Sequence, residues 1–233
     1  THKSPVVATR QLHLGAVGVT CATPFETEVM SAVCGDLLVA YPPVRAVRAQ
    51  RLAALPERVT LTVALDSMRA LDDLHAAARA ANRTIGVLVE LDLGMHRVGL
   101  PVVADAIALA NAVSDRAPLI WKGIAFYPGH VRQPIHDQGA AIAELNATLG
   151  TALAAFRRAG LEPAVVSGGS TPTLWRSHEI AGVTEIRPGT YVYNDVTTAA
   201  IGACAWADCA LTVLATVVST AVPGQAVIDA GSK

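Results

Sequence analysis

The stretch Ile85-Gly-Val-Leu-Val-Glu-Leu91, followed at once by Asp92-Leu-Gly-Met-His-Arg97, indicates most directly how this chain folds. Its first part is apolar along nearly its whole length, as in a strand that is covered on both faces. Its second part is polar and contains glycine, which is typical of a loop. In a parallel α/β fold, each buried strand is followed by a loop and then a helix, and this unit repeats along the chain.

The same pattern occurs six more times along the chain. Apolar runs of strand length alternate with longer segments of helical period, which predicts a parallel sheet built from βα units. The further strands are predicted over Val17–Thr20, Leu37–Ala40, Val59–Leu65, Ile120–Phe126, Ala164–Ser167 and Thr184–Ile186.

Helices are indicated by capping residues and by apolar spacing. Ser4 and Thr23 are each followed by proline, which favours the first helical position, so helices are predicted to begin at Pro5 and Pro24. The segments Ser67–Ala81 and Ile142–Ala159 carry their apolar residues on one stripe. We expect both of these helices to lie against the outside of the sheet.

Seven βα units are one short of an eight-stranded barrel. The sequence therefore predicts, for residues 1–200, a (β/α)8 TIM-like barrel that lacks its first strand, which would lie just before Thr1. Farther on, Leu211–Ser219 and Ala226–Asp229 alternate like an antiparallel hairpin. Residues 201–233 are predicted to be the beginning of a truncated C-terminal β domain.

The composition argues against several classes of protein. A net charge of −1 with interleaved basic and acidic residues provides no basic stripe for nucleic acid, and no apolar run approaches the ~20 residues of a membrane span. The four cysteines form no C-x-x-C pair, and no signal-like N-terminus is present, so we predict a reduced, cytoplasmic protein. The seven histidines show no metal-binding spacing.

Polar groups follow several strands, at the barrel edge where functional groups gather in this fold. The segment Ser167-Gly-Gly-Ser-Thr-Pro-Thr173 combines two glycines with hydroxyl groups before a predicted helix start. Backbone N–H groups, hydroxyls and a helix end together suit a phosphate. An ordinary strand-to-helix turn is an equally good interpretation of this motif alone.

An arginine, Arg187, directly follows the last predicted barrel strand, and Gly189 with Thr190 offers further phosphate donors after it. Because an arginine does not lose its proton, a guanidinium in a barrel mouth needs an acceptor. A structural ion pair with Glu90 or Asp92 is the alternative interpretation. The loop residues Tyr127 and His130, taken singly, are more typical of local hydrogen bonding than of catalysis.

Four segments occur in an order that resembles D-threonine aldolases and D-serine dehydratases, which are pyridoxal-phosphate enzymes of the alanine-racemase-like fold (fold type III). The segments are Asp92–Arg97, Tyr127–His130, Ser167–Thr173 and Arg187–Tyr191. Thr1-His-Lys3 and Val19-Thr-Cys-Ala-Thr23 extend the resemblance to the N-terminus, so that it covers essentially the whole chain.

The resemblance implies roles for individual residues. It places Arg187 opposite the pyridine nitrogen of pyridoxal 5′-phosphate, Arg97 near the phenolic oxygen, and Tyr127 and His130 beside the substrate. The remaining predicted cofactor-binding residues belong to the two phosphate turns: Gly168, Gly169, Ser170, Thr171, Gly189, Thr190 and Tyr191.

The family's Schiff-base lysine and metal ligands have no clear match in this sequence. The resemblance favours a Schiff-base lysine just before Thr1 and matches Lys3 to the second lysine of that motif. A divalent metal is expected in the intact parent, with its histidine and its cysteine or aspartate ligands beyond Lys233.

The resemblance implies a lyase that acts on small D-configured β-hydroxy amino acids, with retro-aldol cleavage to glycine and an aldehyde favoured. A D-serine dehydratase-like ammonia-lyase and an amino-acid racemase stay open as alternatives. A catalytically silent pyridoxal-phosphate-binding protein is the alternative outside enzymes. A homodimer is compatible with the family, but the sequence does not fix the oligomeric state.

Overall fold

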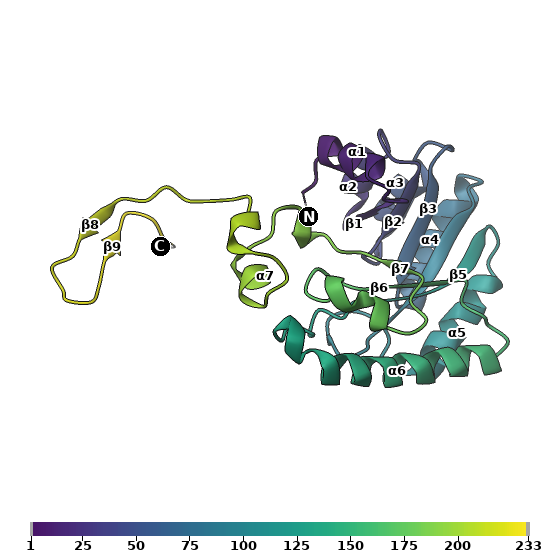
Figure 1. Cartoon of the computed structure of the whole chain (residues 1–233). Coiled ribbons are helices and arrows are strands. Elements are labelled where there is room, and N and C mark those ends of the chain that lie inside the picture. Colours follow the sequence, from purple (N-terminus) through teal and green to yellow (C-terminus); the bar gives the residue numbers. More distant parts are fainter. Residues whose placement is uncertain (1, 232–233) are drawn as a thin grey trace.

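The protein is built around one curled sheet of seven parallel strands with helices on its outer face (Figure 1). The structure, a computed structural model, describes residues 2–231. The strands pair in chain order, and β1 does not pair with β7 within the described residues, so the barrel is open between them. The strands are β1 Val19–Cys21, β2 Asp36–Val39, β3 Thr60–Leu65, β4 Ile85–Leu91, β5 Leu119–Phe126, β6 Val165–Gly168 and β7 Glu185–Ile186.

The strand and helix predictions are confirmed, with small shifts at their ends. Ser4 and Thr23 cap their helices, because their hydroxyls accept hydrogen bonds from the amides of Val7 and Glu26. The α-helices are α1 Pro5–His13, α2 Pro24–Met30, α3 Ala46–Ala53, α4 Met68–Ala80, α5 Val103–Ser114, α6 Gly139–Arg158 and α7 Val196–Ala200. Short 3-10 helices are η1 Ile135–Asp137, η2 Leu174–Glu179, η3 Thr190–Val192 and η4 Trp206–Asp208.

The side chains on the two faces of the sheet belong to separate core clusters. On the outer face, large residues such as Val87 and Phe126 pack with Leu74 of α4 and Leu149 of α6 in the main core. The inner face has a smaller cluster made of Leu38, Ala64, Leu88 and Ala125. The inner face also carries the buried polar side chains of Thr62 and Glu90, which alternate along their strands with the residues of the main core.

Lys122 is the extra residue of a β-bulge between β4 and β5. Val87 pairs with Trp121 and Leu88 with Gly123, so Lys122 has no partner in the register. Its Nζ donates a hydrogen bond to the Thr62 hydroxyl at 3.2 Å. A bulge re-aims a side chain, and this one directs Lys122 toward the early part of β3.

Helix α6 is the one helix in the described chain that is long and apolar enough to cross a membrane by length and composition. Its apolar stripe is buried in the main core, through Ile142, Leu145, Leu149 and Phe156 among others. The helix therefore lies against the outside of the sheet, as its spacing predicted, and packs as part of an α/β layer.

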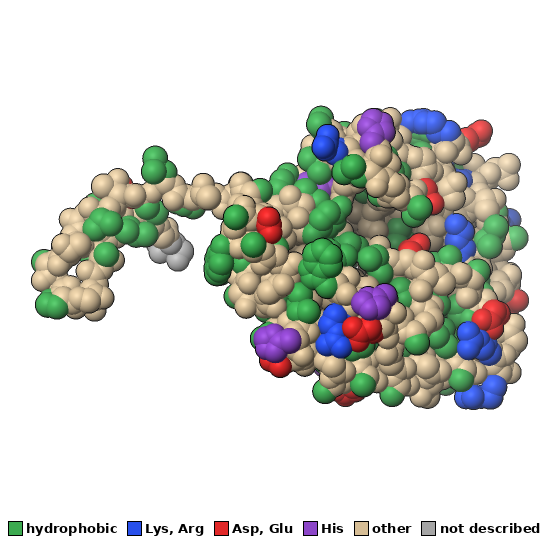
Figure 2. All heavy atoms as spheres, in the orientation of Figure 1, with side chains coloured by type: hydrophobic (Ala, Val, Ile, Leu, Met, Phe, Trp, Pro, Cys, Tyr) green, Lys and Arg blue, Asp and Glu red, His purple; other side chains and the backbone are tan. Residues whose placement is uncertain are grey.

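The last segment of the chain forms an arm that projects from this body (Figure 1). Within it, β8 Val217–Ser219 and β9 Val227–Ile228 form an antiparallel pair, which confirms the predicted pairing, although β8 covers only the last part of the predicted strand Leu211–Ser219. All residues from 211 to 229 are exposed, and hydrophobic side chains lie at several places on the arm's visible face (Figure 2). The division into a barrel of residues 1–200 and a β domain from 201 stays a prediction.

Candidate active site

A cavity of about 550 Å³ opens where the strands end and the sheet stops pairing, between β1 and β7. Seven of the predicted site residues line it: Tyr127, Ser170, Thr171, Arg187, Gly189, Thr190 and Tyr191. Four others, Arg97, His130, Gly168 and Gly169, do not line it. The remaining wall comes from α1, from the ends of β1 and β2, and from residues beside the two turns.

The two predicted phosphate turns meet at this cavity. The amide of Tyr191 donates to the Thr171 hydroxyl at 3.1 Å, and the amide of Arg187 donates to the Gly168 carbonyl at 3.1 Å. The amides of Thr171, Gly189 and Thr190 donate no hydrogen bond within residues 2–231. Unpaired amides on two adjoining turns are the kind of donor set that binds an anion.

Gly168 and Gly169 let the first turn pack tightly. A Cβ on Gly168 would lie 2.3 Å from the ring of Phe126, and a Cβ on Gly169, whose φ is +88°, would lie 3.0 Å from Ile186. The Ser170 hydroxyl is buried and lies within hydrogen-bond distance of the Thr173 hydroxyl. The structure thus gives these residues a role in shaping the turn, while their direct contact with a phosphate stays a prediction.

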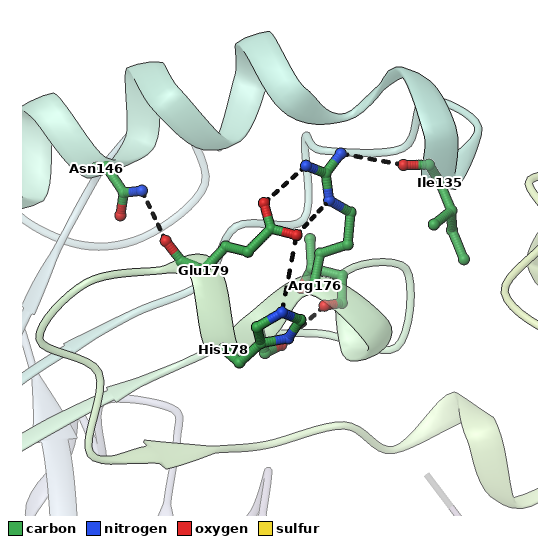
Figure 3. A network of polar contacts seen from close by, with 7 residues as sticks. Ile135, Asn146, Arg176, His178 and Glu179 are labelled. Atoms are coloured by element: carbon green, nitrogen blue, oxygen red, sulfur yellow. Dashed lines mark hydrogen bonds and ion pairs between the residues drawn. The ribbon is translucent and has the colours of Figure 1, made fainter.

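The helix expected after the first turn is a six-residue 3-10 helix, η2. The expected contribution of an α-helix end is therefore wrong, and the donor set consists of turn amides and hydroxyls. A network of polar contacts anchors η2 (Figure 3). Arg176 pairs with Glu179 through two contacts of 2.8 and 2.7 Å, and Asn146 of α6 donates to the Glu179 carbonyl at 2.8 Å.

Arg187 presents part of its surface to the cavity and anchors the rest in the sheet. One terminal nitrogen donates to the carbonyl of Phe126 at 2.7 Å and lies 3.4 Å from that of Ser167. Its Nε is buried without a partner. No ion pair joins it to Glu90 or Asp92 within the described residues. Burial lowers the pKa of the guanidinium, against the opposing effect of the nearby Glu90 and Glu185 carboxylates.

Arg97 lies against two tyrosines that line the cavity. Its guanidinium carbon is 4.7 Å from the ring centroid of Tyr127 and 5.7 Å from that of Tyr41. The loop that carries Arg97 is ordered by Asp92, whose carboxylate accepts from the amides of Gly94 and His96. Burial acts to raise the pKa of Asp92, but these hydrogen bonds outweigh it and hold the pKa below its ordinary value.

His130 does not reach the cavity. It is exposed, and its ring lies beside Gly94, where a Cβ would come within 3.1 Å of it. The predicted catalytic pair is thus split between Tyr127, which lines the cavity, and His130, which lies outside it. The catalytic roles of both residues stay predictions.

Helix α1 supplies a part of the wall that the sequence did not predict. The Nε2 of Gln11 donates to the Tyr191 hydroxyl at 2.6 Å, which bridges the opening between the first and last strands. Lys3 also lines the cavity, and its Nζ lies 2.9 Å from Glu26. Lys122 does not line the cavity, and Lys233 lies outside the described residues.

Tyr41 was missed although a signal for it exists. It directly follows the predicted strand Leu37–Ala40, at the same edge where the other candidates were sought, and it lines the cavity. For Gln11 no such signal exists, because nothing in a helical glutamine indicates which distant turn it will contact. Among the described residues, no group of three or more His, Cys, Asp or Glu side chains is arranged to hold a metal ion.

Comparison with known families explains this combination of open barrel and twin turns. The family described as alanine racemase, N-terminal domain, matches residues 2–196, which is most of the chain. The chain belongs to this family.

Individual relatives agree with that membership. A 3-hydroxy-D-aspartate aldolase from Paracoccus denitrificans (strain Pd 1222) is 31% identical over 100% of this chain and 63% of its own length. A D-threo-3-hydroxyaspartate dehydratase from Delftia sp. (strain HT23) is 34% identical over 99% of this chain and 62% of its own. The crystal structure of D-threonine aldolase from Filomicrobium marinum superposes with a TM-score of 0.82 at 34% identity, covering 99% of this chain and 64% of that one.

The chain thus spans less than two thirds of the length of these relatives. The matched region covers nearly the whole of this chain, including the curled sheet. What the relatives have beyond that length is not represented in this sequence.

Proposed function

We propose that this chain forms the pyridoxal 5′-phosphate site of a lyase that acts on D-configured β-hydroxy amino acids. The observation that carries the proposal is the meeting of two turns with unpaired amides beside a half-buried arginine, Arg187, in a cavity of about 550 Å³. The relatives named as aldolases and a dehydratase of D-hydroxy amino acids support the same assignment.

The donor set fits the phosphate and the ring of this cofactor. The amides of Thr171, Gly189 and Thr190 would bind the phosphate, because they have no other acceptor within the described residues. Arg187 would face the ring nitrogen and, as a cation, disfavour a proton there. When bound, the cofactor supplies an electron sink for bonds at the substrate's α-carbon, while the protein sets orientation and electrostatics.

The remaining residues would hold the substrate beside the cofactor. Tyr127 lies at the wall with its ring against the Arg97 cation, and this contact fixes the ring's orientation. The Tyr127 hydroxyl can then donate to or accept from a polar group of the substrate. For the aldolase, which we favour, a base would take the proton of the substrate's β-hydroxyl as the Cα–Cβ bond breaks, and the products would be an aldehyde and glycine. A divalent metal belongs to this proposal, and none of the described residues is assigned to it.

A binding experiment tests the cofactor assignment. We expect pyridoxal 5′-phosphate to bind at least ~10-fold more tightly than pyridoxal, because phosphate contacts are charge-assisted hydrogen bonds. Gly189→Asp should abolish that preference by placing a carboxylate among the phosphate donors. Gly150→Asp is the matched control, since Gly150 is exposed on α6 with nothing within 4 Å of a Cβ. Equal affinities for both vitamers would contradict the assignment.

Product analysis separates the activities. With D-threonine and D-threo-3-hydroxyaspartate in the presence of Mn²⁺, an aldolase yields glycine and an aldehyde. A dehydratase yields ammonia and a keto acid, and the relative from Delftia keeps this second function in contention. Inversion at the α-carbon without cleavage would identify a racemase, and binding without any turnover would identify a silent cofactor-binding protein.

A further inference from the structure

A single row of residues crosses four strands of the inner face, level with the edge of the cavity. Glu90 of β4 pairs with Ala125 of β5, Ala125 with Ser167 of β6, and Ser167 with Glu185 of β7. The Ser167 hydroxyl donates to Glu185 at 2.5 Å. The row therefore has a carboxyl group at each end and two small residues between them.

Arg187 lies at this row. Its hydrogen bonds go to the carbonyls of Phe126 and Ser167, in the two middle strands. Residues 125 and 167 are alanine and serine, so the inner face has space for a guanidinium at this point. The carboxyl groups of Glu90 and Glu185 flank that position along the register.

No hydrogen bond within the described residues accounts for the burial of the Glu90 carboxyl group. The residue is 2% exposed, its side chain makes no hydrogen bond within the described residues, and its Oε2 is shut off from solvent. The guanidinium of Arg187 also has an unsatisfied atom, because its Nε is buried without a hydrogen-bond partner. Burying a carboxylate without a partner is costly, and an opposite charge in the same low-dielectric region offsets that cost.

We infer that Glu90 is a positioning residue for Arg187, whose carboxyl group balances the guanidinium charge and, on taking up a proton, increases the positive charge that the cavity experiences. Only the identity of the cavity's ligand rests on the proposed function. Glu90 is not among the residues that line the cavity, so it acts through Arg187.

Other charges around Glu90 are consistent with a titration near neutral pH. Burial raises the pKa of Glu90 to about 7, Arg187 and Arg97 oppose this rise, and Asp66 adds to it. Both protonation states are therefore populated under ordinary conditions, and the potential at the cavity depends on pH.

The coupling is tested directly by titrating Glu90 in the ligand-free chain. Carbon-13 NMR of glutamate carboxyl groups, assigned with Glu90→Gln, gives the midpoint. Arg187→Met should raise this midpoint by about 1 unit or more, because an opposite charge is lost. Arg187→Lys keeps the charge and should leave the midpoint close to the wild-type value. An unchanged midpoint in a folded Arg187→Met protein would overturn the inference.

The consequence for the cavity is tested with pyridoxine 5′-phosphate, which cannot react with a lysine. Glu90→Gln mimics the protonated state, so its affinity by calorimetry should equal wild type at pH 6 and exceed it about threefold or more at pH 8.5. Taking the ratio at each pH cancels the titration of the ligand. Glu162→Gln, at an exposed ion pair with Arg157, is the control and should give a ratio near one at both pH values.

The two experiments distinguish a failure of this inference from a failure of the proposed function. An affinity ratio that is the same at pH 6 and pH 8.5 would overturn the inference even if the ligand binds well. If the ligand binds neither protein at either pH, the proposed function fails, while the NMR titration still decides whether Glu90 and Arg187 are coupled.

Discussion

In the body every residue of β4 is buried, whereas in the arm every residue from 211 to 229 is exposed. Both segments are rich in valine and leucine. Strand β4 has a neighbouring strand on each edge and helices across one face, while β8 and β9 pair only with each other. A strand of apolar residues can be buried, but whether it is buried depends on the elements that surround it.

The cavity lies at the boundary between the buried sheet and the segments that lead to the exposed arm. It lies where the pairing of the sheet ends, and one of its walls is formed by segments after β7, in the approach to the arm. There the backbone leaves the regular sheet, and its amides become available to a ligand instead of a neighbouring strand. Amides inside the sheet thus hold the fold together, whereas amides in the turns at the edge of the sheet can bind a ligand.

The largest effect is expected from a core truncation in the body. Phe156 of α6 is fully buried and stacks on Trp121 with 6.0 Å between ring centroids. Phe156→Ala should lower the free energy of unfolding by about 3–5 kcal/mol, through lost burial and the cavity left behind. Urea denaturation measures it. Phe25→Ala, at a position that is 63% exposed, is the matched control and should cost less than about 1 kcal/mol.

A second, somewhat smaller effect is the pH dependence that Glu90 gives to the free energy of unfolding of the body. Burial raises its pKa from 4.5 in the unfolded reference to about 7, so the folded chain keeps a proton that the unfolded chain has released between these values. The corresponding stability is fully present below pH 4.5 and is lost as the pH rises through 7. One pKa unit corresponds to 1.36 kcal/mol, which gives a loss of about 3 kcal/mol.

Glu90→Gln should flatten this part of the stability profile, as measured by urea denaturation between pH 4.5 and pH 8. Glu162→Gln, on the surface, should leave the profile as in wild type. A Glu90→Gln protein that keeps the full pH dependence would show that another group titrates in this window.

The body was predictable from the sequence because its signals are local. Ile85–Leu91 is a continuous apolar run, and the structure places β4 over the same residues. The bulge at Lys122 was not predictable, because it depends on how β5 registers with β4 and leaves the apolar run unchanged. The η2 segment is another case, since a helix-like start gave a 3-10 helix held by Asn146 and Arg176, which are contacts of tertiary structure.

The candidate site divides in the same way. Thr171 and Thr190 were found because glycine and hydroxyl clusters after strands are visible in the sequence. The bond between Gln11 and Tyr191 joins residues 180 positions apart, and the row from Glu90 to Glu185 exists only through register. Sequence reasoning therefore identified residues that line the cavity, and it missed the contact of Gln11 with Tyr191 and the row of paired residues.

A third prediction concerns the bridge that closes the opening of the barrel. Tyr191→Phe removes the hydroxyl that accepts from Gln11 and should weaken the binding of pyridoxal 5′-phosphate by about 1 kcal/mol, or roughly fivefold. Fluorescence titration measures this. Tyr193→Phe is the control, because the Tyr193 hydroxyl makes no hydrogen bond within the described residues, and its affinity should match wild type. Equal losses in both variants would mean that the bridge does not shape the cavity.

The smallest effect is expected in the arm. Leu214 is 99% exposed, so truncating it to alanine removes no burial and should change the free energy of unfolding of the body by less than about 0.5 kcal/mol. The same measurement on Leu74→Ala, a fully buried leucine of α4, should give about 2–5 kcal/mol. Urea denaturation of both variants at two protein concentrations makes the contrast informative. If Leu214→Ala destabilised the protein only at the higher concentration, the arm would be packing against a second copy. An effect comparable to that of Leu74→Ala at both concentrations would mean that the arm folds back onto the body, and the contrast between the two regions would then be wrong.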